Sequence, residues 1–488
     1  MRSSVAFLFS KLESWGFRGL ILSQALGVML LSVQVQTFSV SYGDNEWPNW
    51  RGPYGNGTNP AAKPPKSWSP DSNLAWKVSV AGIGSSTPIV WGNQVIVLTS
   101  EEVDAKSVTE AEMAELESDV PSLGGFGTVT TIGQPTPDQA QERYLAEQKL
   151  TRARKRHRFS VVSYDLESGT KKWETDVVRQ FPHEPCHATN SFASASPVTD
   201  GKHIFAFFGS RGLFCLDMQG VVKWQYSLGH MQTLGSFGEG ASPAVFNDYV
   251  IVPWDHEGDS FLLALNAKNG YVKWKVPRQE RTNWATPIIV KHKDTNQVIV
   301  NGRTVRSYKL ETGELLWSCP GQTEQAIPTP LVNNGRVFVT SGLRGWACFA
   351  ISLDSLGQVP ENSEFVHWTL KKQTPYVPSP CSYDGKLFLF NESSRTISVI
   401  NEENGEAVLP PKRLMDLGDV YASLGIADEM LFITDRAGKT LVLDVKSLEI
   451  VSENSLDETI NASLVFVGNR VLARSSSHLI CLKAEPQQ

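Results

Sequence analysis

Cysteine is scarce in this sequence, and its spacing does not suit a metal or haem site. The 488 residues include only six cysteines, at positions 186, 215, 319, 348, 381 and 481. None belongs to a C-x-x-C pair, to two adjacent cysteines or to a C-x-x-C-H motif, which disfavours structural zinc and c-type haem. The G-x-x-x-x-G-K-[ST] and G-x-S-x-G motifs are absent as well. The sequence therefore gives no support for a P-loop kinase or for a hydrolase with a nucleophile elbow.

An excess of positive charge is also missing. Lys and Arg number 45 against 51 Asp and Glu, and the net charge is −6. Proteins that neutralise phosphates usually present a basic surface, so we expect no nucleic-acid partner. What is abundant is turn-forming and aromatic: 38 Gly, 27 Pro and 14 Trp. This composition favours many short strands joined by tight turns over a helical bundle.

Long hydrophobic runs are confined to the N-terminus. Arg18 precedes an apolar stretch from Leu20 to about Val35, which is short for a membrane span of about 20 residues. A positive flank before a short apolar stretch is typical of a secretory signal peptide. We therefore expect residues 1–43 to be a signal peptide or an uncleaved N-terminal anchor. The protein is expected to be exported to the periplasm or cell envelope, or secreted, with no later transmembrane span.

A repeat occupies most of the remaining chain. A small residue, and then usually Pro, recurs before a β-branched run. The eight copies start at Ser86, Ala195, Ala241, Ala285, Pro328, Pro378, Ala422 and Ala462. After the first interval they lie 40 to 50 residues apart, the period of a four-stranded propeller blade.

A second repeated element is a Gly turn followed four residues later by Trp. It includes Trp173, Trp224, Trp274 and Trp317, and we expect these rings to pack between neighbouring blades. The last copy lacks such a strand, whereas residues 74–78, which include Trp76, form an additional strand of this kind before the first copy. The sequence thus predicts an all-β, eight-bladed propeller over residues 74–488, in which an N-terminal strand closes the last four-stranded antiparallel blade; seven blades is the alternative. A leader over 44–73 precedes it, and we expect a monomer.

The A-L-N/D-x-x-x-G-x-x-x-W element resembles the repeat of the pyrroloquinoline-quinone-type (quinoprotein-like) propeller family. The leader Trp47-Pro48-Asn49-Trp50-Arg51-Gly52-Pro53 is similar to the segment that opens many secreted members. The resemblance implies one of two roles. Quinoprotein dehydrogenases hold the quinone and a calcium ion at the propeller axis, and the propeller lipoprotein of the outer-membrane β-barrel assembly machine is a scaffold without cofactor.

Departures from both branches shape the functional expectation. The chain lacks the adjacent Cys pair of many quinoprotein dehydrogenases, and no full calcium ligand set can be matched. It also lacks the lipid-carrying first cysteine of the assembly lipoprotein. We expect a non-catalytic scaffold in the cell envelope that binds a protein or glycan partner, without cofactor or catalytic residues. The alternative is an alcohol dehydrogenase-like enzyme that depends on pyrroloquinoline quinone and calcium.

Propeller topology brings certain loops to one face of the molecule. The loop before an innermost strand and the hairpin between the second and third strands of a blade lie on the same side. The candidate binding residues on that face are His183, His187, Arg211, Asp255, His256, Arg303, Arg344 and Arg436. Histidines and carboxylates gathered there could form a metal site, and the alternative is a solvated polar rim.

The first blade carries an insertion over 101–157 where the other blades have a short hairpin. It includes two helix-like stretches and the basic run Arg152-Ala153-Arg154-Lys155-Arg156-His157-Arg158. Long insertions are often lids or binding arms, and the basic end suits an acidic partner. The alternative is a solvated helix end.

Overall fold

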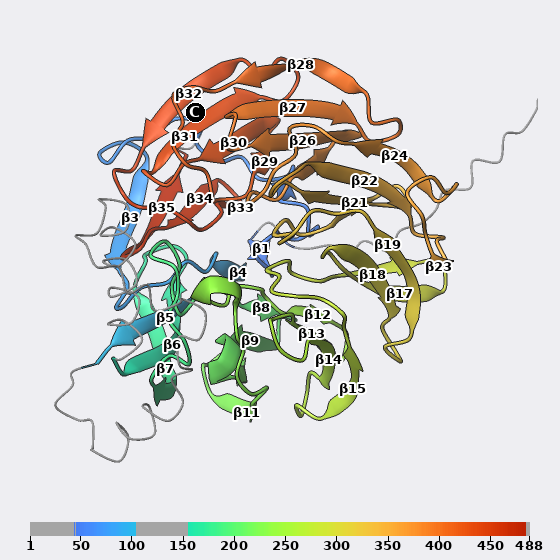
Figure 1. Ribbon diagram of the computed structural model, residues 1–488. Helices are drawn as coiled ribbons and strands as arrows, with labels where there is room; N and C mark the ends of the chain where they lie inside the picture. Colours follow the sequence, from blue (N-terminus) through green and yellow to red (C-terminus); the bar gives the residue numbers. More distant parts are fainter. Residues whose placement is uncertain (1–42, 44, 104–154, 485–488) are drawn as a thin grey trace, which may run out of the picture. The chain divides into compact units, whose positions relative to one another are not determined.

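Eight small sheets follow one another in chain order in the computed structural model (Figure 1), which describes residues 43, 45–103 and 155–484. Apart from two short 3-10 helices, η2 (Gly209–Arg211) and η3 (Leu234–Ser236), the elements of these residues are strands. Each sheet has a core of four antiparallel strands, so the predicted eight-bladed β-propeller is confirmed. The expected signal peptide or anchor, residues 1–43, lies almost wholly outside the described residues.

The first four blades contain the strands of residues 89–320. Blade 1 has β4 (Ile89–Trp91), β5 (Gln94–Glu102), β6 (His157–Asp165) and β7 (Lys171–Gln180). Blade 2 has β8 (Val198–Thr199), β9 (His203–Phe207), β10 (Leu213–Asp217) and β11 (Val222–Tyr226). Blade 3 has β12 (Ala244–Phe246), β13 (Tyr249–Trp254), β14 (Phe261–Asn266) and β15 (Val272–Pro277). Blade 4 has β16 (Ile288–His292), β17 (Thr295–Val300), β18 (Thr304–Lys309) and β19 (Leu315–Pro320).

The last four blades complete the ring. Blade 5 has β20 (Leu331–Asn333), β21 (Arg336–Ser341), β22 (Ala347–Ser352) and β24 (Val366–Leu370). Blade 6 has β25 (Cys381–Tyr383), β26 (Lys386–Asn391), β27 (Thr396–Asn401) and β28 (Ala407–Arg413). Blade 7 has β29 (Gly425–Ala427), β30 (Met430–Thr434), β31 (Lys439–Asp444) and β32 (Ile450–Ser455). Blade 8 has β33 (Val465–Val467), β34 (Arg470–Arg474), β35 (His478–Lys483) and, from before the first blade, β3 (Leu74–Ser79).

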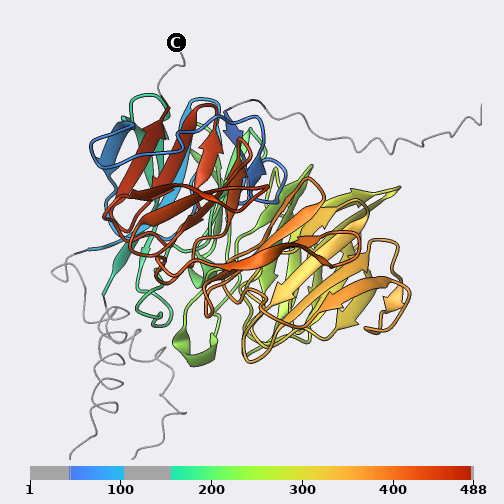
Figure 2. The ribbon, with the colours of Figure 1, turned by 90° about the horizontal axis from the view of Figure 1, so that it is seen from above.

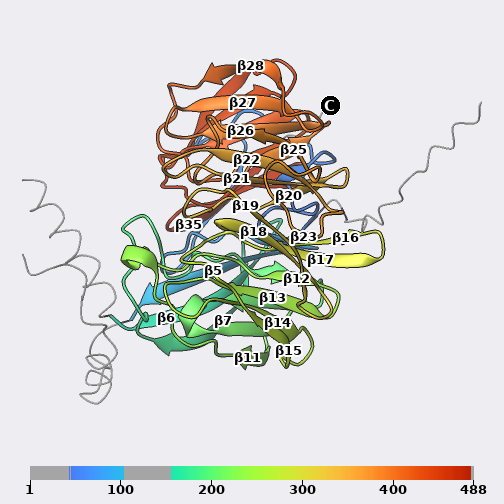
Figure 3. The same ribbon diagram turned by 45° about the vertical axis from the view of Figure 1, so that its right-hand side comes forward.

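Blade 8 is completed as the sequence predicts. β3 pairs antiparallel with β35, with Trp76 opposite Cys481. One sheet is therefore built from both ends of the propeller, which leaves no open seam between the first blade and the last. Blade 4 gains a further short strand from the connection inside blade 5, since β23 (Gly357–Gln358) lies parallel to β19 (Figure 3).

The ends of the first blade differ from the expected boundaries of the insertion. β5 continues to Glu102 and β6 begins at His157, with Glu102 opposite His157 in the ladder. Glu101, Glu102 and His157, which the sequence assigned to the insertion, therefore belong to strands of this blade. The reason is that β5 and β6 keep pairing up to Glu102 and His157. Residues 104–154, which hold both helix-like stretches, lie outside the described residues.

Tryptophans from outer strands join one blade to the next. In the ladder, Trp173, Trp224 and Trp274 stand opposite Ser163, Cys215 and Ala264, the small-residue position of the third strand. The indole Nε1–H of Trp274 donates to the Leu310 carbonyl of the following blade at 2.7 Å. Trp76, Trp173, Trp224 and Trp368 make the same kind of bond to the next blade. These bonds and rings fix the angle between neighbouring sheets.

Trp317 is an exception to this pattern. Its Nε1–H donates to Gln297 Oε1 in its own blade, at 3.2 Å. The Gln297 amide then donates to the Leu353 carbonyl in blade 5. A glutamine therefore relays the contact that the other tryptophans make directly.

The leader supplies what blade 7 lacks. By register, Ser452 stands where six of the blades have Trp, and the leader residue Trp68 lies at this seam instead. The Trp68 ring stacks on Phe432, with the ring centroids 6.2 Å apart, and its backbone N–H donates to Asn454. Leader strand β1 (Glu46–Trp47) pairs with β4 of blade 1, and β2 (Thr58–Asn59) pairs with β29 of blade 7. The leader therefore ties blade 7 to blade 1.

The two faces of the ring differ in what they carry. We call the loop face the side with the connections between blades and the hairpins between second and third strands. The turn face is the opposite side, where the leader pairs with the C-terminal ends of inner strands. In Figure 2 the blue leader lies on the upper side, and green loops of blades 2 and 3 project from the lower side.

Candidate functional site

A ring of hydroxyl groups surrounds the axis. Each copy of the sequence repeat places one Ser or Thr just before its inner strand. The eight residues are Thr87, Ser196, Ser242, Thr286, Thr329, Ser379, Ser423 and Ser463. Seven hydrogen bonds of 2.9–3.2 Å link them, each from the backbone N–H of one residue to the side-chain oxygen of the next. The bond from Ser463 to Thr87 closes the ring between the last blade and the first.

The ring is broken at one position. No bond from Thr286 N–H to Thr329 is present among the described contacts, and the buried Thr329 hydroxyl has no hydrogen-bond partner. Blades 4 and 5 meet at this point. The gap falls next to the blade whose Trp317 docks through a glutamine, so this junction departs from the others in two ways.

An axial cavity of about 160 Å³ lies within the ring. Seven of the eight ring residues line it, all except Thr329. Its other lining residues are Trp50, Ser85, Ser194, Gly240, Trp284, Ile327, Val377, Tyr421, Asn461 and Ala462. Trp50 is the one described lining residue that comes from the leader. The cavity is therefore bounded by the inner edges of the blades and by the leader.

A buried arginine lies behind Trp50. The Arg51 side chain is 2% exposed, and its guanidinium lies 5.4 Å from the centre of the Trp50 ring. It donates to the carbonyl oxygens of Leu424, Asn56 and Pro380. Burial lowers the pKa of this guanidinium, and no carboxylate among the described residues pairs with it.

The lining of the cavity does not fit a calcium ion with pyrroloquinoline quinone. Calcium takes six to eight oxygen ligands, usually including carboxylates. None of the described lining residues is Asp, Glu, Lys, Arg or His. The one side-chain amide, of Asn461, is already bonded to Arg436 and to the Thr189 carbonyl. The volume is also about half of the ~300 Å³ at which pockets for drug-sized ligands begin.

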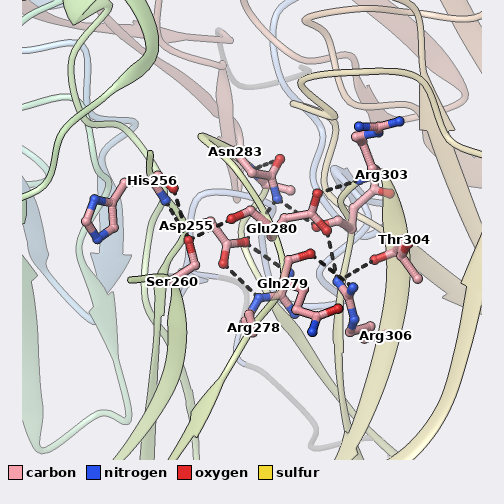
Figure 4. Close-up of polar contacts among 12 residues, drawn as sticks. Asp255, His256, Ser260, Arg278, Gln279, Glu280, Asn283, Arg303, Thr304 and Arg306 are labelled. Atoms are coloured by element: carbon pink, nitrogen blue, oxygen red, sulfur yellow. Dashed lines mark hydrogen bonds and ion pairs between the residues drawn. The ribbon is translucent and has the colours of Figure 1, made fainter. Parts of the chain in front are cut away.

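The loop face between blades 3 and 4 holds a buried ion pair (Figure 4). Arg278 donates from Nε and Nη2 to the two oxygens of Asp255 at 2.7 and 3.0 Å, and the side chains are 0% and 1% exposed. Burial by itself lowers the pKa of the Arg278 guanidinium, but the charge and hydrogen bonds of Asp255, together with Tyr308 and Glu280, outweigh burial and leave that pKa raised. Asp255 is therefore held in a structural ion pair and is not accessible to solvent.

A second carboxylate extends this network into blade 4. Glu280 accepts hydrogen bonds from Arg306 Nη1 at 2.9 Å and from the backbone N–H of Arg303 (Figure 4). The hydroxyl of Ser260 donates to the Glu280 carbonyl at 2.8 Å. The connection between blades 3 and 4 is thereby clamped to the hairpins of both blades. Such paired, buried charges rigidify a surface, because removing one partner leaves the other unsatisfied.

Two half-buried glutamates lie beside the loops of blades 1 to 3. Glu184 accepts from the backbone N–H and hydroxyl of Thr233, and Glu239 does the same from Ser210. Burial raises the pKa of Glu184 to about 8, with a further rise from the Glu239 charge. Burial likewise raises the pKa of Glu239. A small cavity of about 30 Å³ lies between these loops.

The structure sorts the eight candidate binding residues into distinct environments. Asp255 and His256 are buried, and His256 Nδ1 accepts backbone N–H groups of Gln232 and Gly258. His183 stacks on His230 with ring centroids 4.1 Å apart, and His187 contacts Thr189 through Nδ1.

The four arginines of the candidate set point to different uses. Arg211 donates to Gln180, and Arg303 is exposed. Arg436 lies over the Tyr421 ring at 4.8 Å and donates to Asn461, so it contacts two residues that line the axial cavity. Arg344 is 81% exposed, and Glu324 lies 3.7 Å away. The eight residues thus do not converge on one site.

One hairpin of the loop face presents side chains suited to protein contact. The β21–β22 hairpin carries Arg344 and, two residues later, Trp346, which is 49% exposed. Its base is held by bonds from Thr323 N–H to the Ser341 hydroxyl and from Thr374 to the Ser341 carbonyl. Trp and Arg are the side chains most enriched at the energetic centres of protein interfaces.

Neither a metal cluster nor a membrane-spanning helix is found in the described part of the chain. No group of three or more His, Cys, Asp and Glu side chains there is arranged to hold a metal ion. No helix of residues 43, 45–103 and 155–484 is long and apolar enough to cross a bilayer.

Sequence reasoning missed the hydroxyl ring, Trp50 and Arg51 as parts of one site. A signal for the ring was present, because the second position of all eight repeat copies is Ser or Thr. That position was interpreted only as a marker of strand starts. The pattern of a hydroxyl residue before each inner strand, read together with a closed ring, would have placed eight hydroxyls around the axis.

Comparison with known proteins identifies relatives of the fold. A family profile described as outer membrane protein assembly factor BamB matches residues 157–409, just over half of the chain. The crystal structure of BamB from Moraxella catarrhalis is 14% identical with a TM-score of 0.50, covering 66% of this chain and 91% of the other. No curated protein sequence matches the chain significantly.

Two alcohol-oxidising dehydrogenases share the architecture over more of the chain. A europium-containing methanol dehydrogenase is 9% identical with a TM-score of 0.58, covering 91% of this chain and 98% of the other. The quinohemoprotein alcohol dehydrogenase from Comamonas testosteroni is 10% identical with a TM-score of 0.55, covering 91% and 82%. At such identities these structures report the fold alone. With the family match, the chain belongs to the pyrroloquinoline-quinone-like β-propeller family that includes the outer membrane protein assembly factor BamB.

Proposed function

We propose that the protein is a non-catalytic binding scaffold of the cell envelope, which engages a protein partner through its loop face. The observation that carries the proposal is the lining of the axial cavity. Its described lining residues include no Asp, Glu, Lys, Arg or His, and its volume is about 160 Å³. A cofactor-dependent enzyme of this architecture would need calcium ligands and more space at the axis.

The loop face supports the binding role. Its connections are clamped by Arg278 with Asp255 and by Arg306 with Glu280, so the loops form a preorganised surface. Trp346 and Arg344 project from this surface on one hairpin. A rigid platform with exposed Trp and Arg is typical of a surface that binds protein.

Export belongs to the same proposal. The positive flank and short apolar stretch within residues 1–43 have the pattern of a secretory signal. The family description, an outer membrane assembly factor, concerns a protein of the envelope. We therefore place this chain in the periplasm or the envelope and expect a protein partner there.

The first test asks whether the axis accepts a quinone. The melting temperature of the protein is measured with pyrroloquinoline quinone at rising concentration, with and without calcium. A ligand at a hundred times its Kd stabilises the folded state by about 2.7 kcal/mol, so binding is visible as a raised melting temperature. We expect no shift. A calcium-dependent rise would overturn the scaffold role and favour an alcohol-oxidising enzyme.

The second test locates the binding surface. Tagged wild type, Trp346→Ala and Tyr271→Ala are used to isolate cross-linked partners from the envelope fraction. Tyr271 is the control because it is 75% exposed and follows a turn at the other end of the strands. We expect a partner to be lost with Trp346→Ala and retained with Tyr271→Ala. Equal recovery by both variants would contradict the assignment to the loop face.

A further inference from the structure

The hydroxyl groups of the ring can donate hydrogen bonds into the axial cavity. Each of the seven ring hydroxyls that line the cavity accepts a hydrogen bond from the backbone N–H of the preceding ring residue. A hydroxyl also carries one proton. Among the described residues no protein group receives these seven protons, and all seven hydroxyls border the cavity. The ring is therefore a set of hydrogen-bond donors around the axis.

A positive charge lies close to the same space. Arg51 is buried and bonds only carbonyl oxygens and the Cys381 sulfur among the described groups. Two of these carbonyls, of Pro380 and Leu424, directly follow ring residues Ser379 and Ser423. Carbonyl dipoles solvate a guanidinium but do not neutralise it, and buried charges are normally paired with an opposite charge. The electropositive side of the cavity is thus at blades 6 and 7.

We propose that the axial cavity binds a small anion, of the size of acetate or chloride, through the hydroxyl ring. An anion accepts hydrogen bonds without donating any, which matches a ring that donates. Hydrogen bonds to a charged acceptor are about twice as strong as neutral ones. The volume of about 160 Å³ admits such an ion with a few water molecules. This site is independent of the scaffold role on the loop face.

The direct test uses fluorine NMR on the folded protein. Trifluoroacetate is the probe, and trifluoroethanol is the neutral control of similar size. We expect line broadening and saturation transfer for trifluoroacetate only, reversed by acetate and by chloride. Equal signals from both probes, or none from trifluoroacetate at tens of millimolar, would overturn the proposal and leave a cavity that holds water.

Variants show whether the ring is the binding site. Ser379→Ala with Ser423→Ala removes two donors nearest to Arg51, and Ser379→Thr with Ser423→Thr keeps them. Thr already occupies three other ring positions, so the ring accommodates its methyl group. We expect trifluoroacetate affinity to fall about tenfold or more in the Ala pair and to change less than twofold in the Thr pair. Equal affinities in both pairs would contradict binding at the ring.

If the Ala pair does not fold, crystals of the unmodified protein soaked in bromide provide an independent test of binding at the ring. Bromide scatters anomalously and stands in for chloride. We expect an anomalous peak on the axis within hydrogen-bond distance of the ring hydroxyls. Peaks confined to the outer surface would overturn the proposal. Neither result bears on quinone binding, which the calcium-dependent melting experiment decides separately.

Discussion

The backbone N–H of Ser463 donates to the hydroxyl oxygen of Thr87 at 3.1 Å, although 376 positions separate the two residues. This bond joins the last blade to the first at the innermost edge of the ring. The pairing of β3 with β35 joins the two ends of the chain again at the outer edge. A ring closed at both radii leaves no exposed sheet edge at the seam, which protects it from pairing with other chains.

The Thr87 hydroxyl should contribute to stability through this seam. Thr87→Val keeps the shape but removes the acceptor of the buried Ser463 N–H. We expect the free energy of unfolding to fall by about 1–3 kcal/mol, because a buried donor is left unsatisfied. Denaturant unfolding measures it. Thr329→Val is the control, since the Thr329 hydroxyl has no partner, and it should be neutral or slightly stabilising.

The Arg278–Asp255 pair should be costly to break and cheap to replace. Asp255→Ala strands a fully buried guanidinium, and we expect a loss of about 3–5 kcal/mol. Replacing both residues, Arg278→Met with Asp255→Leu, should cost much less than the single change. Arg281→Met is the exposed comparison, since Arg281 pairs with Glu257 at the surface and should cost at most about 1 kcal/mol. A single-variant loss no larger than the double-variant loss, by thermal or chemical unfolding, would refute this.

The close approach of Trp274 to Gly313 should be measurable by adding one methyl group. A Cβ at Gly313 would lie 2.8 Å from two Trp274 ring carbons, at a φ of +73°. Gly385 has nearly the same φ, +70°, but open space around it. Gly385→Ala should therefore cost about 1–2 kcal/mol from backbone strain alone. Gly313→Ala should lower the free energy of unfolding by about 1–3 kcal/mol more, because its methyl group conflicts with the Trp274 ring. Equal losses would mean that the ring moves freely aside.

Glu184 should make the protein less stable as pH rises. Its folded pKa of about 8 lies above the ordinary carboxyl value, because burial favours the protonated form and Glu239 adds to the rise. Between pH 5 and 8 the folded state therefore binds more protons than the unfolded state, and the unfolding free energy falls by at most about 1.4 kcal/mol per pH unit. Glu184→Gln should flatten the melting temperature over this range. An unchanged slope in the variant would show that other groups carry the dependence.

The sequence predicted the architecture of the propeller but not the environment of its functional side chains. The spacing of repeat copies such as Ala195-Ser196-Pro197 predicted eight blades, and the surplus strand before the first copy predicted how β3 completes the last. Both features are local and repeat along the chain. The environment of Asp255 could not be predicted in this way, because Arg278 reaches it from the next connection and buries it. Arg51 was recognised only as part of a leader motif, and its place beside the axis depends on contacts with residues more than 300 positions away.

The number of blades, the four-strand pattern and the closing strand follow from the repeat in the sequence. A periodic pattern of turns and β-branched runs specifies each blade locally, and the period identifies the closed architecture. Contacts between distant segments decide that the leader brings Trp50 and a buried Arg51 to the axis, and that the candidate loop residues divide between buried ion pairs and exposed side chains. Those outcomes depend on which residues meet across blades. Burial and charge pairing between distant segments set them, and no local pattern encodes either.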